Sequence, residues 1–133
     1  MTGLDTNVLV RYLTQDDPRQ SRRANALVAE AVSGGERLFV STVVLCELVW
    51  VLRGAYALDK AAVVTALERI LVTTQLEIDQ KDVVRAALED YRGAGGDFAD
   101  YVIGRRGREA GCDRTATFDR HLKASSLFRV LAG

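Results

Sequence analysis

The sequence predicts an α/β protein with a mostly parallel sheet that is covered by helices on both faces. Short apolar segments typical of buried strands alternate along the chain with longer segments whose apolar residues recur at helical spacing. The chain has 133 residues, 48% of them hydrophobic, and 18 basic residues balance 18 acidic ones. This length and composition favour a single globular domain over residues 1–133 and exclude a disordered tail.

The expected elements follow one another without a linker or an internal repeat. Asp17-Pro18 is a capping residue followed by proline at the first helical position, and Asp59 and either Ser41 or Thr42 are further caps. Strands are expected at residues 3–4, 38–40, 76–78, 114–118 and 128–131. Helices are expected at residues 7–13, from 18 to about 32, around Glu47 after its cap, after Asp59, at about 81–91 and near 97–110.

The termini and cysteines bear on where the protein acts. The N-terminus lacks a basic segment followed by a long apolar run, so no signal peptide is expected. No stretch reaches the roughly 20 apolar residues that a membrane span needs. Cys46 and Cys112 have no metal-type spacing and are expected to be reduced thiols. We therefore expect a cytoplasmic protein.

Glu47 is the most unusual residue of the chain because it lies within the apolar stretch 43–52. An unpaired buried carboxylate costs several kcal/mol, so a buried Glu47 needs a partner from outside its own helix. A divalent cation shared with other carboxylates is one such partner, and a salt bridge to a distant arginine is the alternative.

Other carboxylates are expected near the same edge of the sheet. Asp5 directly follows the first strand, and Asp119 follows the fourth. Asp97 and Asp100 open the helix before the fourth strand, three residues apart and so on one helix face. Ligands of such sheets gather at the carboxyl ends of the strands, where clustered carboxylates repel one another unless a cation is present. Oxygen ligands favour magnesium or manganese over zinc.

Each of these residues also has a simpler structural interpretation. Asp5 and Asp119 are suited to cap the helical segments that follow them. Asp97 and Asp100 are suited to complement a helix dipole, which for Asp97 is as good an account as ligation. Four separate caps, however, have no reason to converge on one edge of a sheet.

The ordered set of motifs resembles that of PIN-domain ribonucleases, most closely the VapC toxins of bacterial toxin–antitoxin pairs. The motifs are Leu4-Asp5-Thr6-Asn7, the apolar helix around Glu47, Asp97-Phe98-Ala99-Asp100 and Thr117-Phe118-Asp119. The resemblance extends over essentially the whole chain. It implies a PIN-like three-layer α/β/α sandwich with a central five-stranded parallel sheet in the order 3-2-1-4-5.

The resemblance also implies an activity and its residues. It implies a Mg²⁺- or Mn²⁺-dependent endoribonuclease that cleaves specific RNA phosphodiester bonds with a metal-activated water. Asp5, Glu47, Asp100 and Asp119 match the acidic quartet, as catalytic residues and as metal ligands. Thr6, Asn7, Asp97 and Thr117 are the supporting polar residues. Whether one or two ions act is left open.

Candidate contacts to RNA are less specific. Arg11 follows Asn7 by one turn and Arg105 lies in the helix that Asp97 opens, so we expect both near the rim of the acidic pocket. A solvated, charged helix face is an equally good account of any one arginine. No aromatic platform for stacked bases is visible in the sequence.

The apolar content of the two central helices exceeds what one small domain readily buries, which favours association. By resemblance, a homodimer is expected, together with a cognate VapB-like antitoxin that lies along the protein and obstructs the acidic pocket.

Two other functions compete with the nuclease. A phosphatase of the haloacid-dehalogenase type also begins with an aspartate after its first strand, but its second aspartate is Asn7 here and a suitable lysine is missing. A non-catalytic module whose acidic pocket docks a protein partner is the other alternative. It leaves the retention of every acidic position unexplained.

Overall fold

The computed structural model describes all 133 residues and divides into two compact units, Met1–Lys81 and Asp82–Gly133. Each unit has its own strands and its own buried residues, and each is described separately. No helix of the chain is both long enough and apolar enough to cross a lipid bilayer.

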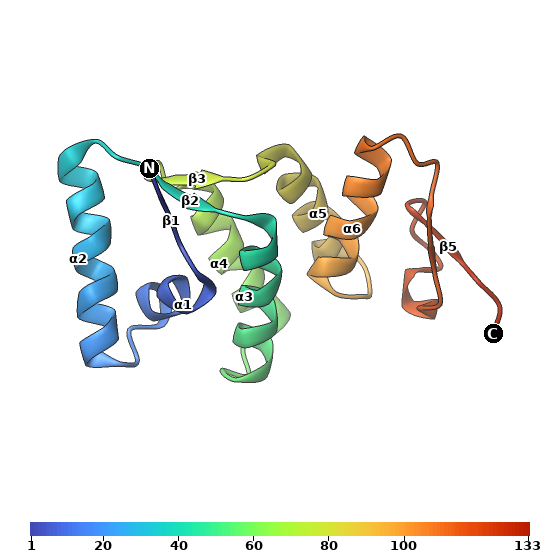
Figure 1. Ribbon diagram of the computed structural model, residues 1–133. Coiled ribbons are helices and arrows are strands. Elements are labelled where there is room, and N and C mark those ends of the chain that lie inside the picture. The colour runs from blue at the N-terminus through green and yellow to red at the C-terminus, as the bar shows by residue number, and fades with distance from the viewer. The chain divides into compact units, whose positions relative to one another are not determined.

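The first unit contains a three-stranded parallel sheet. Its strands are β1 (Thr2–Gly3), β2 (Leu38–Val40) and β3 (Leu76–Ile78), in the order β1-β2-β3. Thr2 is in register with Leu38, and Leu38 with Leu76. The three strands are labelled in Figure 1. The predicted strands at 38–40 and 76–78 are confirmed, whereas the first strand lies one residue earlier than expected.

Four helices complete the first unit: α1 (Thr6–Thr14), α2 (Pro18–Gly34), α3 (Thr42–Gly54) and α4 (Lys60–Val72). The predicted caps are confirmed, because side chains of Asp17, Ser41 and Asp59 each accept a hydrogen bond from a first-turn backbone N–H. Gly35 ends α2 with a φ of 65°, a left-handed conformation that glycine adopts without steric cost.

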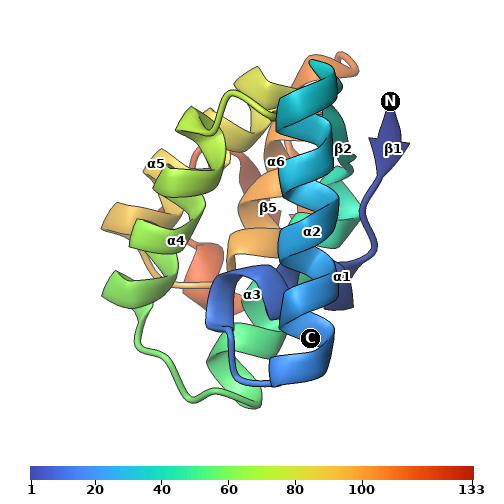
Figure 2. The same ribbon diagram turned by 90° about the vertical axis from the view of Figure 1, so that its left-hand side faces the viewer.

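The core of the first unit lies between its sheet and its helices. Val40, Leu45, Leu48, Val63 and Leu67 are all buried in it. Figure 2 shows α1 crossing behind the lower part of α2, and the two helices are linked by a hydrogen bond from Ser21 Oγ to the carbonyl of Arg11. α1 also packs against α3, the helix that carries Glu47.

The second unit consists of α5 (Lys81–Gly93), α6 (Phe98–Glu109), β4 (Thr115–Thr117), a short 3₁₀ helix (Arg120–Leu122) and β5 (Phe128–Val130). β4 and β5 pair in parallel. Tyr91 meets Phe98 and Tyr101 meets Phe128 edge-on, and all four rings are buried. At Gly104 an added Cβ would lie 2.9 Å from Phe128 Cζ, so glycine allows β5 to approach α6 closely.

The single five-stranded sheet implied by the family resemblance is the main difference from expectation. The five strands form two sheets, β1-β2-β3 and β4-β5, which correspond to the 3-2-1 and 4-5 parts of the expected order. β1 has only two residues and β4 only three, so few backbone groups are available for further pairing. Alternation of strands and helices predicts parallel neighbours, and that part is confirmed; it does not by itself fix which strands join.

Candidate functional site

The acidic residues of the first unit are linked through Thr6. Asp5 follows β1 and is the N-cap of α1, where its Oδ1 accepts a hydrogen bond from Thr6 N at 2.8 Å. Thr6 Oγ1 donates to Glu47 Oε1, also at 2.8 Å, and the Thr6 side chain is buried. The hydroxyl thus holds a residue of α3 against the start of α1. The cap interpretation of Asp5 is confirmed, and it is compatible with a second role for the free carboxylate oxygen.

Glu47 is exposed, which corrects the prediction that it is buried in the apolar helix. The buried face of α3 consists of Val44, Leu45, Leu48, Val49 and Leu52. Position 47 falls on the opposite face, at helical spacing from Val43 and Trp50, which are 66% and 54% exposed. The run is apolar on both sides of the helix, so sequence neighbours did not reveal which side packs.

The acidic residues of the second unit lie close enough to affect one another. The backbone N–H of Asp97 donates to Asp100 Oδ2 at 2.8 Å, at the start of α6. Burial raises the pKa of the Asp100 carboxyl, and the negative charges of Asp97 and Asp119 raise it further, against the lowering effect of that hydrogen bond. Asp100 is therefore a half-buried carboxylate that the fold alone leaves electrostatically unfavourable.

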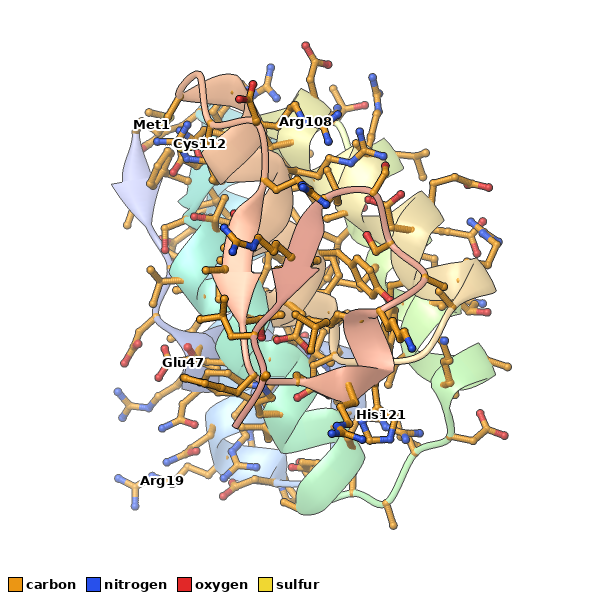
Figure 3. The ribbon with its side chains drawn as sticks, turned by 90° about the vertical axis from the view of Figure 1, so that its right-hand side faces the viewer. Met1, Arg19, Glu47, Arg108, Cys112 and His121 are labelled. Carbon is orange, nitrogen blue, oxygen red and sulfur yellow. The ribbon has the colours of Figure 1, made fainter.

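Asp119 caps the short helix that follows β4. Its Oδ1 accepts from the backbone N–H of His121 at 2.9 Å and lies 3.0 Å from His121 Nδ1. These two contacts lower the pKa of the Asp119 carboxyl. The backbone N–H of Asp119 donates to Thr117 Oγ1 at 3.1 Å, so the Thr117 hydroxyl fixes the turn. Figure 3 shows His121 on this turn of the second unit.

Gly96 and Tyr101 are site residues that were not selected from the sequence. Gly96 has a φ of 90°, and an added Cβ would lie 2.8 Å from Leu122 Cδ2 and 3.3 Å from Asp100 Oδ2. The Tyr101 hydroxyl donates to the carbonyl of Gly95, which holds the same loop. The closeness in sequence of Gly96 to the predicted ligand Asp100 was the available signal that this loop has a required conformation.

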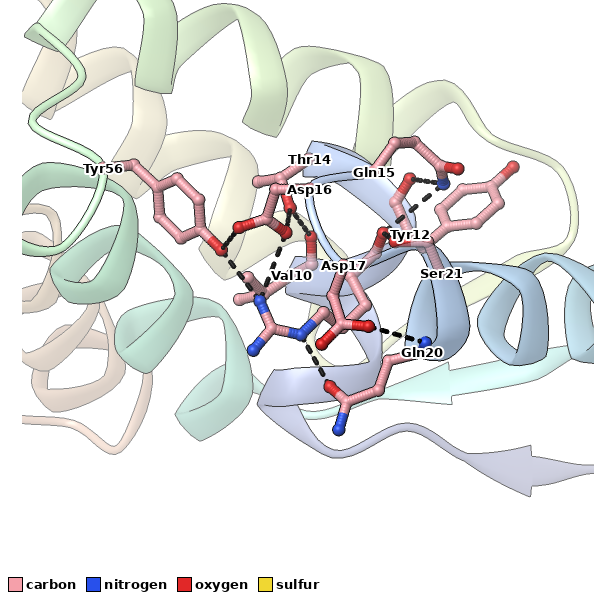
Figure 4. A network of polar contacts seen from close by, with 10 residues as sticks. Val10, Tyr12, Thr14, Gln15, Asp16, Asp17, Gln20, Ser21 and Tyr56 are labelled. Carbon is pink, nitrogen blue, oxygen red and sulfur yellow. Dashed lines mark hydrogen bonds and ion pairs between the residues drawn. The ribbon is translucent and has the colours of Figure 1, made fainter.

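The two predicted RNA-contacting arginines are engaged within their units. Arg11 donates from Nε to Gln20 Oε1 at 2.7 Å and from Nη1 to Tyr56 Oη and Asp16 Oδ1 (Figure 4). Hydrogen bonds from Tyr56 and Thr14 lower the pKa of Asp16 to about 2. This network joins the end of α1, the start of α2 and the loop after α3.

Arg105 forms two hydrogen bonds to the carboxylate of Asp90, at 2.7 and 2.8 Å. This geometry orients the guanidinium in a fixed plane. Both Arg11 and Arg105 thus have acidic partners, and contact with RNA remains a prediction for each.

The oxygen donors of these residues are of the type that a hard cation prefers. The carboxylates are divided, with Asp5 and Glu47 in the first unit and Asp97, Asp100 and Asp119 in the second. Nowhere do three or more acidic, histidine or cysteine side chains meet in a geometry that could hold a metal ion. The chemistry of oxygen ligands and the raised pKa of Asp100 nevertheless suit a divalent cation of the magnesium type.

Comparison with known proteins decides the family. The model of the PIN domain matches residues 4–125, a span that contains all the acidic residues described above. The chain belongs to the PIN-domain family. It is also similar to a VapC ribonuclease of Aquifex aeolicus (strain VF5), with 27% identity over 123 residues, which cover 92% of this chain and 90% of that protein. The resemblance noted from the motifs is thereby confirmed.

Proposed function

We propose that this protein is a magnesium- or manganese-dependent endoribonuclease of the VapC type, restrained by a cognate antitoxin. The observation that carries the proposal is the match to the PIN family, and the raised pKa of the half-buried Asp100 carboxyl near Asp97 and Asp119 supports it. Like charges raise the pKa of a carboxyl, and a cation relieves that repulsion. PIN nucleases generally depend on a metal ion, and the distant relative is named a ribonuclease.

The first unit contributes three residues to the proposed site, Asp5, Glu47 and Asn7. Asp5 supplies a carboxylate oxygen, and its cap bond to Thr6 N limits how its side chain rotates. Glu47 is held by the Thr6 hydroxyl, so that it can accept a proton from a water molecule or support a cation. Asn7 follows on the exposed side of α1, where its amide is available to a phosphate oxygen.

The residues of the second unit complete the proposed donor set. Asp100 and Asp119 contribute carboxylates, and Asp97 fixes the Asp100 rotamer through its backbone N–H. By family resemblance, Asp5 and Glu47 are the other proposed metal ligands. A bound Mg²⁺ or Mn²⁺ would supply a Lewis acid that polarises the scissile phosphate and lowers the pKa of a water ligand. The products expected from attack by water carry a 5′-phosphate and a 3′-hydroxyl.

The antitoxin part of the proposal rests on family likeness and on one surface feature. An open groove of about 320 Å³ lies in the first unit, with apolar side chains from Val8, Ala24 and Leu27 and with Arg11 and Arg23 at its rim. An amphipathic segment of a VapB-like antitoxin suits such a groove. A homodimer is proposed on the same family likeness.

The test is cleavage of total bacterial RNA by the antitoxin-free protein, with Mg²⁺ or Mn²⁺ and with a chelator. An Asp5→Asn variant purified identically controls for contaminating nuclease. We expect discrete fragments that require both the metal and Asp5. Folded protein that yields no fragments with either metal would contradict the nuclease and favour an acidic pocket that only docks a partner.

A further inference from the structure

Residues 114–120 alternate between the two sides of the extended chain that contains β4. The odd-numbered residues Thr115, Thr117 and Asp119 are partly buried, whereas the even-numbered residues are exposed. The extended conformation continues through Asp119, whose φ and ψ are −78° and 110°. The exposed set, on one side of this segment, is Arg114, Ala116, Phe118 and Arg120.

The neighbouring strand adds a further cation to this face. Ala116 is in register with Arg129 of β5, and both residues are exposed. Residues in register on paired strands point to the same side of a sheet, so Arg129 lies beside Ala116. None of Arg114, Arg120 and Arg129 forms an ion pair, in contrast to Arg11 and Arg105.

Phe118 is the most conspicuous residue of this face. Its side chain is 71% exposed, whereas Phe98 and Phe128 of the same unit are buried. The last residue, Gly133, borders one edge of the ring, where an added Cβ would lie 3.3 Å from Phe118 Cε1. Most of the ring is open to solvent, and it lies between Thr117 and the proposed ligand Asp119.

We propose that this outer face of the β4–β5 sheet binds single-stranded RNA, with a nucleobase stacked on Phe118 and phosphates held by Arg129 and its neighbouring arginines. An exposed aromatic ring flanked by cations is the combination that binds single strands, because every base has a π-face and every linkage a negative charge. The inference rests on the proposed nuclease function. It assigns one base of the bound strand to Phe118.

The composition of the face favours RNA over a protein partner. The exposed neighbours of Phe118 on this face are one alanine and three arginines, so positive charge rather than apolar area distinguishes it. The chain as a whole has no net charge, so three unpaired arginines on one face are a local concentration of positive charge. The aromatic platform that the sequence did not reveal is therefore present at residue 118.

The experiment measures binding of fluorescein-labelled 12-nucleotide oligoadenosine to the full chain by anisotropy, in the Asp5→Asn background so that RNA stays intact. Adding Phe118→Ala is expected to weaken binding about 10-fold, within the range that one base–aromatic stack contributes. Phe118→Trp should bind within about threefold of the parent, because it preserves stacking. Phe118→Leu should resemble Phe118→Ala, which separates stacking from simple hydrophobic contact.

Two matched controls accompany these variants. Ile103→Ala removes another exposed apolar side chain of the same unit, 55% exposed, and should leave binding unchanged. Arg129→Ala should reduce the slope of log K against log salt by about 0.7, the value for one phosphate contact on a single strand. Arg106→Ala, whose guanidinium is paired with Glu109, should leave that slope unchanged.

The outcomes separate this inference from the nuclease proposal. If Phe118→Ala binds oligoadenosine as tightly as its parent, the platform is refuted, and a simultaneous change in oligomeric mass would assign Phe118 to a protein interface. The wild-type protein could also fail to cleave RNA while Phe118→Ala and Phe118→Leu weaken oligoadenosine binding. That result would refute the nuclease and leave the platform standing. Circular dichroism verifies folding, and retained binding by Phe118→Trp shows that the site tolerates substitution.

Discussion

The two units hold their acidic residues in different ways. In the first unit a neutral side chain and backbone group, both from Thr6, bind Asp5 and Glu47. In the second unit Asp100 is half-buried near Asp97 and Asp119, and this crowding raises its pKa. The first arrangement is satisfied without a ligand, whereas the second becomes favourable when a cation arrives. The difference indicates that the second unit has the stronger electrostatic need for a cation.

The largest effect is expected at Asp100, the residue on which the contrast depends. Asp100→Asn should lower metal-dependent RNA cleavage at least about 100-fold, since even residues behind a ligand contribute 10–100-fold. Asparagine still accepts the hydrogen bond from Asp97 N. Cleavage rates on total RNA, compared with the exposed control Asp113→Asn, measure this effect.

The same substitution should lower activity but raise stability relative to wild type as pH increases. The folded pKa of Asp100 is raised above its ordinary value of 3.8, so the unfolded chain ionises this group more easily. Wild-type stability therefore falls as pH rises from the pKa of Asp100 in the unfolded chain to its higher pKa in the folded protein. Asp100→Asn removes the ionisable group and avoids this loss. In metal-free buffer the variant's melting temperature relative to wild type should increase between pH 4 and pH 7. A constant difference would contradict the crowding.

The loop under Asp100 provides the next test. Gly96→Ala places a Cβ at a φ of 90° and 2.8 Å from Leu122 Cδ2. Strain of this kind costs about 1–3 kcal/mol, and the displaced Asp100 should reduce cleavage as well. Gly95→Ala, where the nearest atom would be 3.5 Å away, is the matched control. Urea unfolding of the two variants measures the difference.

The first unit should respond to the loss of one hydroxyl with a change in activity more than in stability. Thr6→Val keeps the side-chain shape but removes the hydrogen bond to Glu47, so cleavage should fall about 10-fold while the free energy of unfolding changes by about 1 kcal/mol. Thr6→Ser retains the hydroxyl and should retain most of the activity. Equal activity of Thr6→Val and wild type would remove Glu47 from the proposed site.

The smallest effect concerns the network around Arg11, which lies outside both acidic groups. Tyr56→Phe removes the hydroxyl that is the main cause of the low pKa of Asp16. The pKa of Asp16 should rise from about 2 toward 3.8, which a carboxyl ¹³C NMR titration resolves. A carboxyl whose pKa is lower in the folded than in the unfolded state stabilises the folded protein at pH values above its unfolded pKa. The variant should therefore be less stable than wild type above pH 4, and the difference should shrink below pH 4.

Local signals in the sequence predicted most of the fold. Asp17-Pro18, Ser41 and Asp59 are caps whose chemistry is independent of tertiary context, and each begins a helix as expected. Pairing across the sheets depends on backbone contacts between distant segments, and there the expectation of one five-stranded sheet was wrong. The membership in the PIN family followed from the order of the motifs.

The prediction for the site failed where packing decides. The apolar residues around Glu47 in the sequence suggested a buried position. They did not reveal that α3 has an exposed apolar face, so the burial of Glu47 was predicted wrongly. Phe118 was treated as part of a strand motif because sequence does not show on which side of a strand the solvent lies. The raised pKa of Asp100 depends on distances between three loops, which no spacing rule supplies.

The measurement that tests the central claim most directly is calorimetric titration of Mn²⁺ into wild type, Asp5→Asn and Asp100→Asn, with Asp113→Asn as control. If Asp5 and Asp100 are both metal ligands, as proposed, both Asp5→Asn and Asp100→Asn should weaken Mn²⁺ binding at least about 10-fold, while Asp113→Asn binds like wild type. Wild-type affinity for Mn²⁺ in either Asp5→Asn or Asp100→Asn would contradict the proposed ligand set.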